Sequence, residues 1–122
     1  MSDLTICSIY HTAMTKSILE LNWEHTKKLN PDTEFKWLAC DNSPRSAPIK
    51  IDEKKFTVVP GVTVPDYVPR GSASGYYMGL ALNEMIKKVD TRFMAILDYD
   101  VFISRPRWIG DVLGHMKKNN LS

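Results

Sequence analysis

The spacing of apolar residues changes period twice within the first forty residues, and this change constrains the fold more than any other feature. Leu4 to Ile9 (LTICSI) is a short apolar and β-branched run that predicts a strand. The positions after it recur at helical spacing: Met14, Ile18, Leu21, His25 and Leu29. This pattern ends at Asn30-Pro31-Asp32, because proline cannot continue a helix. Phe35 to Cys40 (FKWLAC) then predicts a second strand, so the segment is a βαβ unit with parallel strands.

The rest of the chain continues this alternation. Phe56 to Val59 (FTVV) predicts a third strand, and a helix is predicted over Ser74 to Lys88, with Ser72 or Ser74 as its N-cap. The continuous apolar run Phe93 to Leu97 (FMAIL) is typical of a strand buried on both faces of a parallel sheet. After it, Ser104 is a candidate cap for a helix with the apolar stripe Ile109, Val112, Leu113 and Met116.

These elements predict an α/β fold, a three-layer sandwich with a mainly parallel sheet of about four strands. The chain has 122 residues, of which 43% are hydrophobic and 25% charged, a composition typical of one globular domain. We therefore expect a single domain over residues 1–122. Cys7 and Cys40 lie inside apolar runs and not at a metal-ligand spacing, which favours two reduced core thiols.

Charge and hydropathy exclude some classes of partner. Sixteen Lys and Arg oppose fourteen Asp and Glu, and the net charge of +2 is interspersed, so we expect no nucleic-acid partner. No uncharged stretch reaches the roughly 20 apolar residues of a membrane span. Asp3 stands where a signal peptide carries basic residues. We expect no transmembrane segment and a cytoplasmic location.

The apolar run at Phe93 to Leu97 ends abruptly in Asp98-Tyr99-Asp100. If the backbone stays extended there, both carboxylates point to the same side. The carboxyl end of a central strand is where open α/β sheets bind ligands, and Mg²⁺ and Mn²⁺ prefer oxygen ligands of this kind. The spacing alone leaves two interpretations open, a divalent metal site and a pair of solvated acidic residues in a turn.

Taken together, these features resemble the nucleotide-sugar-binding half of family 2 glycosyltransferases, which have the GT-A fold. The resemblance rests on the N-terminal strand Leu4 to Ile9 and on the second strand's ending in Asp41-Asn42-Ser43. It also rests on the apolar run into Asp98-Tyr99-Asp100, followed by Pro106 and an amphipathic helix. The resemblance implies a protein that binds a nucleotide-diphosphate sugar, most often a UDP-sugar. It further implies glycosyl transfer to an acceptor, which is a saccharide, a lipid or a protein.

The same resemblance implies roles for individual residues. Asp98 and Asp100 would hold a Mn²⁺ or Mg²⁺ ion that bridges the donor diphosphate and neutralises charge as it leaves. Asp41 would hydrogen-bond the nucleobase. The other implied contacts to the nucleotide sugar are Tyr10, His11, Thr12, Arg70, Gly71, Ser74, Asp98 and Tyr99.

The resemblance leaves the catalytic base unassigned. In the family, the acceptor site and the base come from the portion that follows the donor half, and Asp111 is the only carboxylate here after Asp100. We therefore expect the chain to lack the acceptor-binding portion. A non-catalytic nucleotide-sugar-binding or assembly module is the main alternative. A haloacid-dehalogenase-like phosphatase is a distant third, because Phe102 stands where its motif has Thr or Val. An uncovered apolar sheet surface would favour a homodimer.

Overall fold

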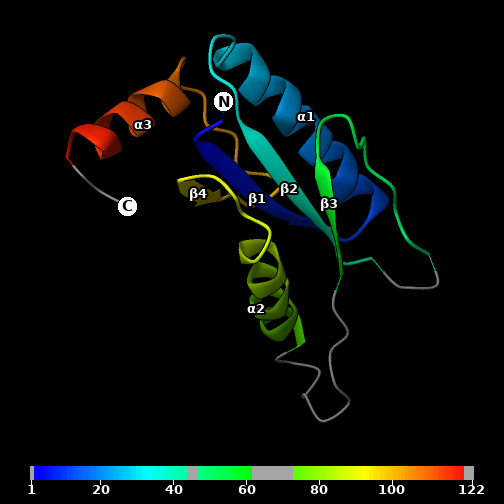
Figure 1. Ribbon diagram of the computed structural model, residues 1–122. Helices are drawn as coiled ribbons and strands as arrows, with labels where there is room; N and C mark the ends of the chain where they lie inside the picture. The colour runs from blue at the N-terminus through cyan, green and yellow to red at the C-terminus, as the bar shows by residue number, and fades with distance from the viewer. Residues whose placement is uncertain (1, 44–46, 62–72, 120–122) are drawn as a thin grey trace.

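The computed structural model describes residues 2–43, 47–61 and 73–119, without the side chains of 73–77. Figure 1 shows strands and helices alternating along this part of the chain. Their bounds are β1 (Leu4–Tyr10), α1 (Ala13–Leu29), β2 (Lys36–Asp41), β3 (Thr57–Pro60), α2 (Ala73–Ile86), β4 (Phe93–Ile96) and α3 (Trp108–Lys118). Each predicted strand and helix is present, with its ends displaced by a few residues.

The four strands form one parallel sheet in the order β3-β2-β1-β4. In this register Cys7 of β1 lies opposite Leu38 of β2 on one side and Ile96 of β4 on the other. Helices α1 and α3 cover one face of the sheet and α2 covers the other (Figure 1). The predicted α/β sandwich with a parallel sheet is confirmed.

The alternation of side chains along the strands builds a separate core on each face. Trp37 of β2 points to the α1 and α3 face, where it packs edge-on against Phe56, with 5.7 Å between ring centroids. Leu38, the next residue, points to the α2 face and packs in a smaller cluster with Ala81 and Met85. Both faces of β1 and β2 are therefore buried, as expected of inner strands in a parallel sheet.

The prediction that Phe93 to Leu97 is buried on both faces is wrong. Within the described residues β4 pairs only with β1, so it is an edge strand and not a central one. Phe93 is buried, but Met94 is 38% exposed and Ile96 is 52% exposed. The reason is that α2 packs over β1 and β2 and leaves the corresponding face of β4 uncovered.

The apolar positions that predict α1 do not mark its buried face. Met14 and Leu21 are 68% and 63% exposed. The buried positions are Thr15, Leu19, Asn22 and Thr26. The polar side chains of this face are hydrogen-bonded, which offsets the cost of burying them. Thr15 and Thr26 bond within α1 and its N-cap, and Asn22 bonds to the segment after β4.

The start of α3 is also set by α1, and the predicted cap at Ser104 is wrong. The N-cap residue is Arg107, whose backbone is left-handed with φ of 60°. Its N–H donates to the Leu29 carbonyl (2.8 Å), and the N–H of Ile109 donates to Oδ1 of Asn30 (3.0 Å). The buried Asn30 at the end of α1 thus accepts from an N–H in the first turn of α3. In most helices the side chain of the N-cap residue, often a serine, accepts from such an N–H.

Candidate functional site

A pocket of about 420 Å³ lies where the strand order reverses. From β1 the chain passes to β2 through α1 on one face, and it enters β4 through α2 on the other face. Such a reversal leaves a crevice beside the carboxyl ends of the two strands. The lining residues are Cys7, Ser8, Ile9, His11, Asn42, Met78, Leu82, Ile96, Leu97, Asp98 and Tyr99.

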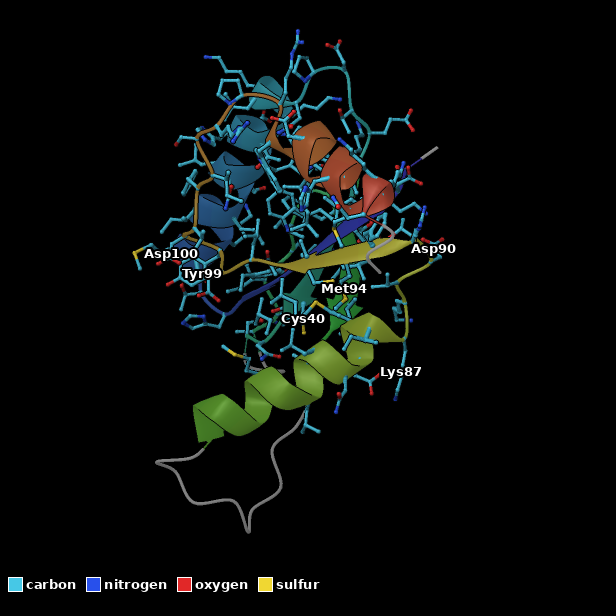
Figure 2. All side chains as sticks on the ribbon, turned by 90° about the vertical axis from the view of Figure 1, so that its left-hand side faces the viewer. Cys40, Lys87, Asp90, Met94, Tyr99 and Asp100 are labelled. Atoms are coloured by element: carbon cyan, nitrogen blue, oxygen red, sulfur yellow. The ribbon has the colours of Figure 1, made fainter. Side chains whose placement is uncertain are left out.

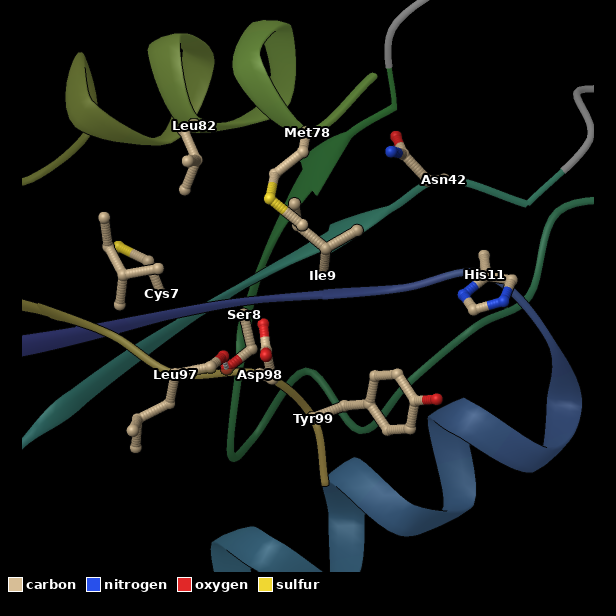
Figure 3. A pocket seen from close by; sticks show the side chains of 11 residues that line it. Cys7, Ser8, Ile9, His11, Asn42, Met78, Leu82, Leu97, Asp98 and Tyr99 are labelled. Carbon is tan, nitrogen blue, oxygen red and sulfur yellow. Dashed lines mark hydrogen bonds between the residues drawn. The ribbon is translucent and has the colours of Figure 1, made fainter. Parts of the chain in front are cut away.

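One side of the pocket is apolar. Met78 and Leu82 point from α2 toward the sheet, and Cys7 and Ile9 of β1 face them (Figure 3). Ile96 adds a side chain from the exposed face of β4. A concave, mostly apolar lining with a few polar groups is the usual form of a site for an organic ligand.

The polar end of the pocket lies beyond the last residues of β1 and β4. The rings of His11 and Tyr99 meet edge to face there, with 6.2 Å between their centroids. Asp98 is exposed at the rim, and Asn42 reaches the pocket from the end of β2. The pocket therefore offers a carboxylate, an imidazole, a phenol and an amide at one end.

Hydrogen bonds to the core position the end of β4. The Ser8 hydroxyl donates to the Leu97 carbonyl (2.7 Å) and accepts from the indole N–H of Trp37 (3.0 Å). The Leu97 N–H donates to the Cys7 carbonyl (3.0 Å). Both the N–H and the carbonyl of Leu97 are therefore hydrogen-bonded, which fixes the position of the next residue, Asp98.

The segment after Asp98 is held by α1. Nδ2 of Asn22, a fully buried residue, donates to the carbonyls of Val101 (2.7 Å) and Tyr99 (3.3 Å). The Val101 N–H donates to the Asp98 carbonyl (3.1 Å), which closes a turn over these residues. This arrangement keeps the Tyr99 ring against His11.

Three of the predicted site residues, His11, Asp98 and Tyr99, come together at the pocket. Asp100 does not line it. The expectation that Asp98 and Asp100 point to one side requires an extended backbone, and the Asp98–Val101 turn breaks that condition. Figure 2 shows Asp100 at the outer end of this turn.

Tyr10 and Thr12 lie close to the pocket in sequence but do not line it. Tyr10 is completely buried, and its hydroxyl donates to the Ile49 carbonyl (2.6 Å). Burial, reinforced by the nearby Asp41 carboxylate, raises the pKa of its phenol well above the ordinary value. Thr12 is the N-cap of α1, where its hydroxyl accepts from the N–H of Thr15 (3.0 Å). Both side chains thus have structural roles.

Asp41, the predicted base contact, is engaged by its own loop. Its Oδ1 accepts from the N–H of Ser43 (2.9 Å) and from the Ser43 hydroxyl. Its Oδ2 accepts from the N–H of Ile49 (3.2 Å). The carboxylate organises the chain after β2, and the neighbouring Asn42 lines the pocket in its place. Arg70 and Gly71 lie outside the described residues, as does the side chain of Ser74.

Sequence reasoning did not identify the apolar wall of the pocket. Cys7 and Ile9 are readable from the alternation along β1, because they share a face. Met78 and Leu82 are one helical turn apart, but nothing local shows that their side of α2 faces a ligand site. Asn42 has a signal in the sequence, since a polar residue at the end of a parallel strand lies at the ligand edge of the sheet.

The chemistry available in the pocket depends on charge. Within residues 2–43, 47–61 and 73–119 no Lys or Arg lines it, and no three His, Cys, Asp or Glu side chains gather as a metal site. Asp98 is the one carboxylate among the described lining residues. A single carboxylate does not form a complete protein cage, but Mg²⁺ or Mn²⁺ ions that bind a phosphate often keep only one or two protein carboxylates. Burial raises the pKa of the Cys7 thiol to about 11, so it is no nucleophile at neutral pH.

Across the described helices, none combines the length and the apolar character needed to cross a bilayer. Comparison with known proteins adds no relative: no protein-family model, curated protein or solved structure matches this chain.

Proposed function

We propose that the pocket binds a nucleotide-diphosphate sugar, with a UDP-sugar as the first candidate, and that the chain is the donor-binding part of a glycosyltransferase. The observation that carries this proposal is the position of the pocket. It lies at the carboxyl ends of β1 and β4, at the reversal of strand order, with Asp98 at its rim. Open α/β sheets bind nucleotides at this point.

The lining residues suit the parts of such a ligand. The apolar wall of Met78, Leu82 and Ile9 suits the flat face of a base or a sugar ring. A diphosphate beside Asp98 would be repelled unless a cation lay between them, and no described lining residue supplies one. We therefore include Mn²⁺ or Mg²⁺ in the proposal, held by Asp98 and the diphosphate. When bound, such an ion offsets the charge that develops on the leaving diphosphate.

The main alternative is a module that binds a nucleotide sugar without transferring it. Among the described residues, Asp98 is the only carboxylate that lines the pocket, so no second carboxylate is in position to act as a catalytic base. This observation favours binding over transfer for the part of the chain described. A cytoplasmic location and the identity of the acceptor stay predictions from the sequence.

Calorimetric titration of UDP, GDP and UDP-sugars, with and without Mn²⁺, tests the proposal. We expect metal-dependent binding in the wild type and in Asp100→Asn, and loss of that binding in Asp98→Asn. Asp100 is the matched control, because it is an exposed carboxylate two residues away that does not line the pocket. The proposal fails if no nucleotide diphosphate binds, and the site assignment fails if the two variants lose binding equally.

Donor hydrolysis separates a transferase from a binding module. A transferase donor site cleaves its UDP-sugar slowly to UDP and free sugar in the absence of acceptor, and we expect Asp98→Asn to abolish this cleavage. Binding without any cleavage, on its own and with a panel of saccharide acceptors, would favour the binding module.

A further inference from the structure

The outer edge of β4 carries backbone groups with which no described strand pairs. The N–H groups of Phe93 and Leu97 donate to the carbonyls of Asp3 (2.9 Å) and Cys7 (3.0 Å) in and next to β1. Because backbone groups alternate along a strand, Met94 and Ile96 direct their N–H and carbonyl groups away from β1. No described strand lies on that side. Figure 2 shows β4 in front of the rest of the sheet, with Met94 on it.

This edge is also apolar and lacks the usual protection. Met94 and Ile96 share the α2 face of β4 and are both exposed. Met78, Leu82 and Ile86 follow at four-residue spacing along α2, and the first two line the pocket together with Ile96. Natural sheet edges usually carry charged residues, proline or a bulge. Residues 93–97 contain no charge and no proline.

We propose that β4 pairs in antiparallel fashion with β4 of a second copy of this chain, which joins the two sheets across a two-fold axis. Such an interface is self-complementary, so every contact occurs twice. The proposal does not rest on the proposed function, although both use Asp98: in the dimer this carboxylate faces Arg92 of the second copy, and in the proposed function it holds a metal ion. Dimerisation is measured without nucleotide and metal, so either proposal can fail alone.

The register of this pairing follows from which residues face outward. Only residues whose backbone groups point away from β1 can exchange hydrogen bonds with the second copy, and these are the even-numbered ones. Each even-numbered residue must therefore lie opposite an even-numbered residue of the second copy. A pair centred on Ala95 places Met94 opposite Ile96. It also places Arg92, just before the strand, opposite Asp98, just after it.

The neighbouring registers are less favourable. Centring the pair on Met94 places Asp90 opposite Asp98, two like charges. Centring it on Ile96 places Arg92 opposite Asp100, which lies in the turn after the strand, and places the apolar Met94 opposite Asp98. Opposite charges and apolar pairs directly across two strands are stabilising, whereas like charges are destabilising. The Ala95 register also places Asp90 opposite Asp100, but Asp90 already pairs with Lys36 (2.9 Å) and Asp100 lies in the turn after Asp98. The Met94–Ile96 and Arg92–Asp98 pairs, each formed twice, therefore favour a second copy as the partner and Ala95 as the centre.

Arg92 must reorient to make this contact. Its guanidinium carbon lies 4.9 Å from the centroid of its own Phe93 ring, and its side chain is exposed. A rotation of this long side chain brings the charge to the edge without disturbing the core. In the dimer, Arg92 of the second copy then lies at the rim of the pocket beside Asp98.

Sedimentation velocity over a concentration series of the 122-residue chain tests the proposal. We expect a reversible monomer–dimer equilibrium, and amide hydrogen exchange at Met94 and Ile96 that slows as the protein concentration rises. Ile96→Lys should give a monomer, because it adds a charge to the edge. Val112→Lys is the matched control, since Val112 is 46% exposed on α3, and it should still dimerise.

A charge swap tests the register itself. Arg92→Asp and Asp98→Arg should each weaken dimerisation about tenfold, because each places two like-charge pairs across the interface. The double variant should restore it. Circular dichroism of each variant should show an unchanged fold, because both residues are exposed. A monomer at every concentration, a dimer that survives Ile96→Lys, or a double variant that is not restored would overturn the proposal.

Discussion

Gly61 follows β3 at a point where two backbone segments nearly touch. A Cβ there would lie 2.1 Å from the Asp41 carbonyl oxygen and 3.1 Å from its carbonyl carbon. Both atoms belong to the backbone, so no side chain can move aside. We expect Gly61→Ala to separate the ends of β2 and β3 and to lower the free energy of unfolding by about 2 kcal/mol. Urea denaturation measures the change.

Gly79→Ala is the control for this substitution. Gly79 lies within α2, and a Cβ there would meet nothing within 4 Å. Alanine is the better helix former, so we expect this variant to gain about 0.5–1 kcal/mol. Equal effects of the two substitutions would contradict the close approach at Gly61.

Cys7 and Cys40 are free and buried, and burial raises the pKa of each thiol to about 11. We expect Ellman's reagent to modify neither thiol of the native protein at mildly alkaline pH, and both in guanidinium. Unfolded thiols ionise from their ordinary pKa of 9.0, whereas folded ones stay protonated to about 11. The folded state then binds more protons, so stability falls as pH rises through this window. Rapid labelling of the native protein would contradict the assigned burial.

At the level of whole elements, local periodicity was sufficient to predict the strands and helices. Local spacing and composition are set by neighbouring residues alone, so the short continuous apolar run Phe93–Leu97 was recognisable as a strand. Its place in the sheet depends on strand order, which no local pattern contains. An apolar run therefore predicted a central strand, and the structure has an edge with Met94 and Ile96 exposed.

The candidate site was predictable to a similar extent. Asp98, Tyr99 and His11 follow strands, and parallel strands end at one edge of the sheet, so their meeting follows from the fold class. The separation of Asp100 from Asp98 depends on a turn held by Asn22 from another helix. The engagement of Asp41 depends on where Ile49 returns to it. Such tertiary hydrogen bonds are not encoded in the spacing of the residues concerned.

Asn22 connects α1 to the pocket through its hydrogen bonds to the segment after β4. Asn22→Ala removes the donor of two part-buried hydrogen bonds, to the Val101 and Tyr99 carbonyls. We expect a loss of about 2 kcal/mol in the free energy of unfolding, and weaker nucleotide binding through the displaced Tyr99. Denaturation and calorimetry measure the two effects. Asn83→Ala, an exposed position on α2, should change neither, and an unaffected Asn22→Ala variant would exclude the link.

For the molecule as a whole, the sheet separates two cores of unequal size. The core under α1 and α3 contains large aromatic residues such as Trp37, Phe56 and Trp108. The core under α2 contains small or medium-sized side chains, and α2 contributes only Ala81 and Met85 as fully buried residues within its described part. Less apolar surface therefore holds α2 to the sheet than holds α1 and α3.

We expect this inequality to appear as separate opening of α2. Native-state hydrogen exchange in increasing denaturant should show the amides of residues 78–86 exchanging at a lower free energy than those of α1, because regions with little buried apolar area open first. Met85→Ala should lower the opening energy of α2 by about 2–3 kcal/mol while moving that of α1 less. Ligands that fill the pocket should protect α2, since Met78 and Leu82 line it. If α1 and α2 exchange at one common free energy, the two cores unfold as a single unit and the apolar wall of the pocket is as rigid as the sheet.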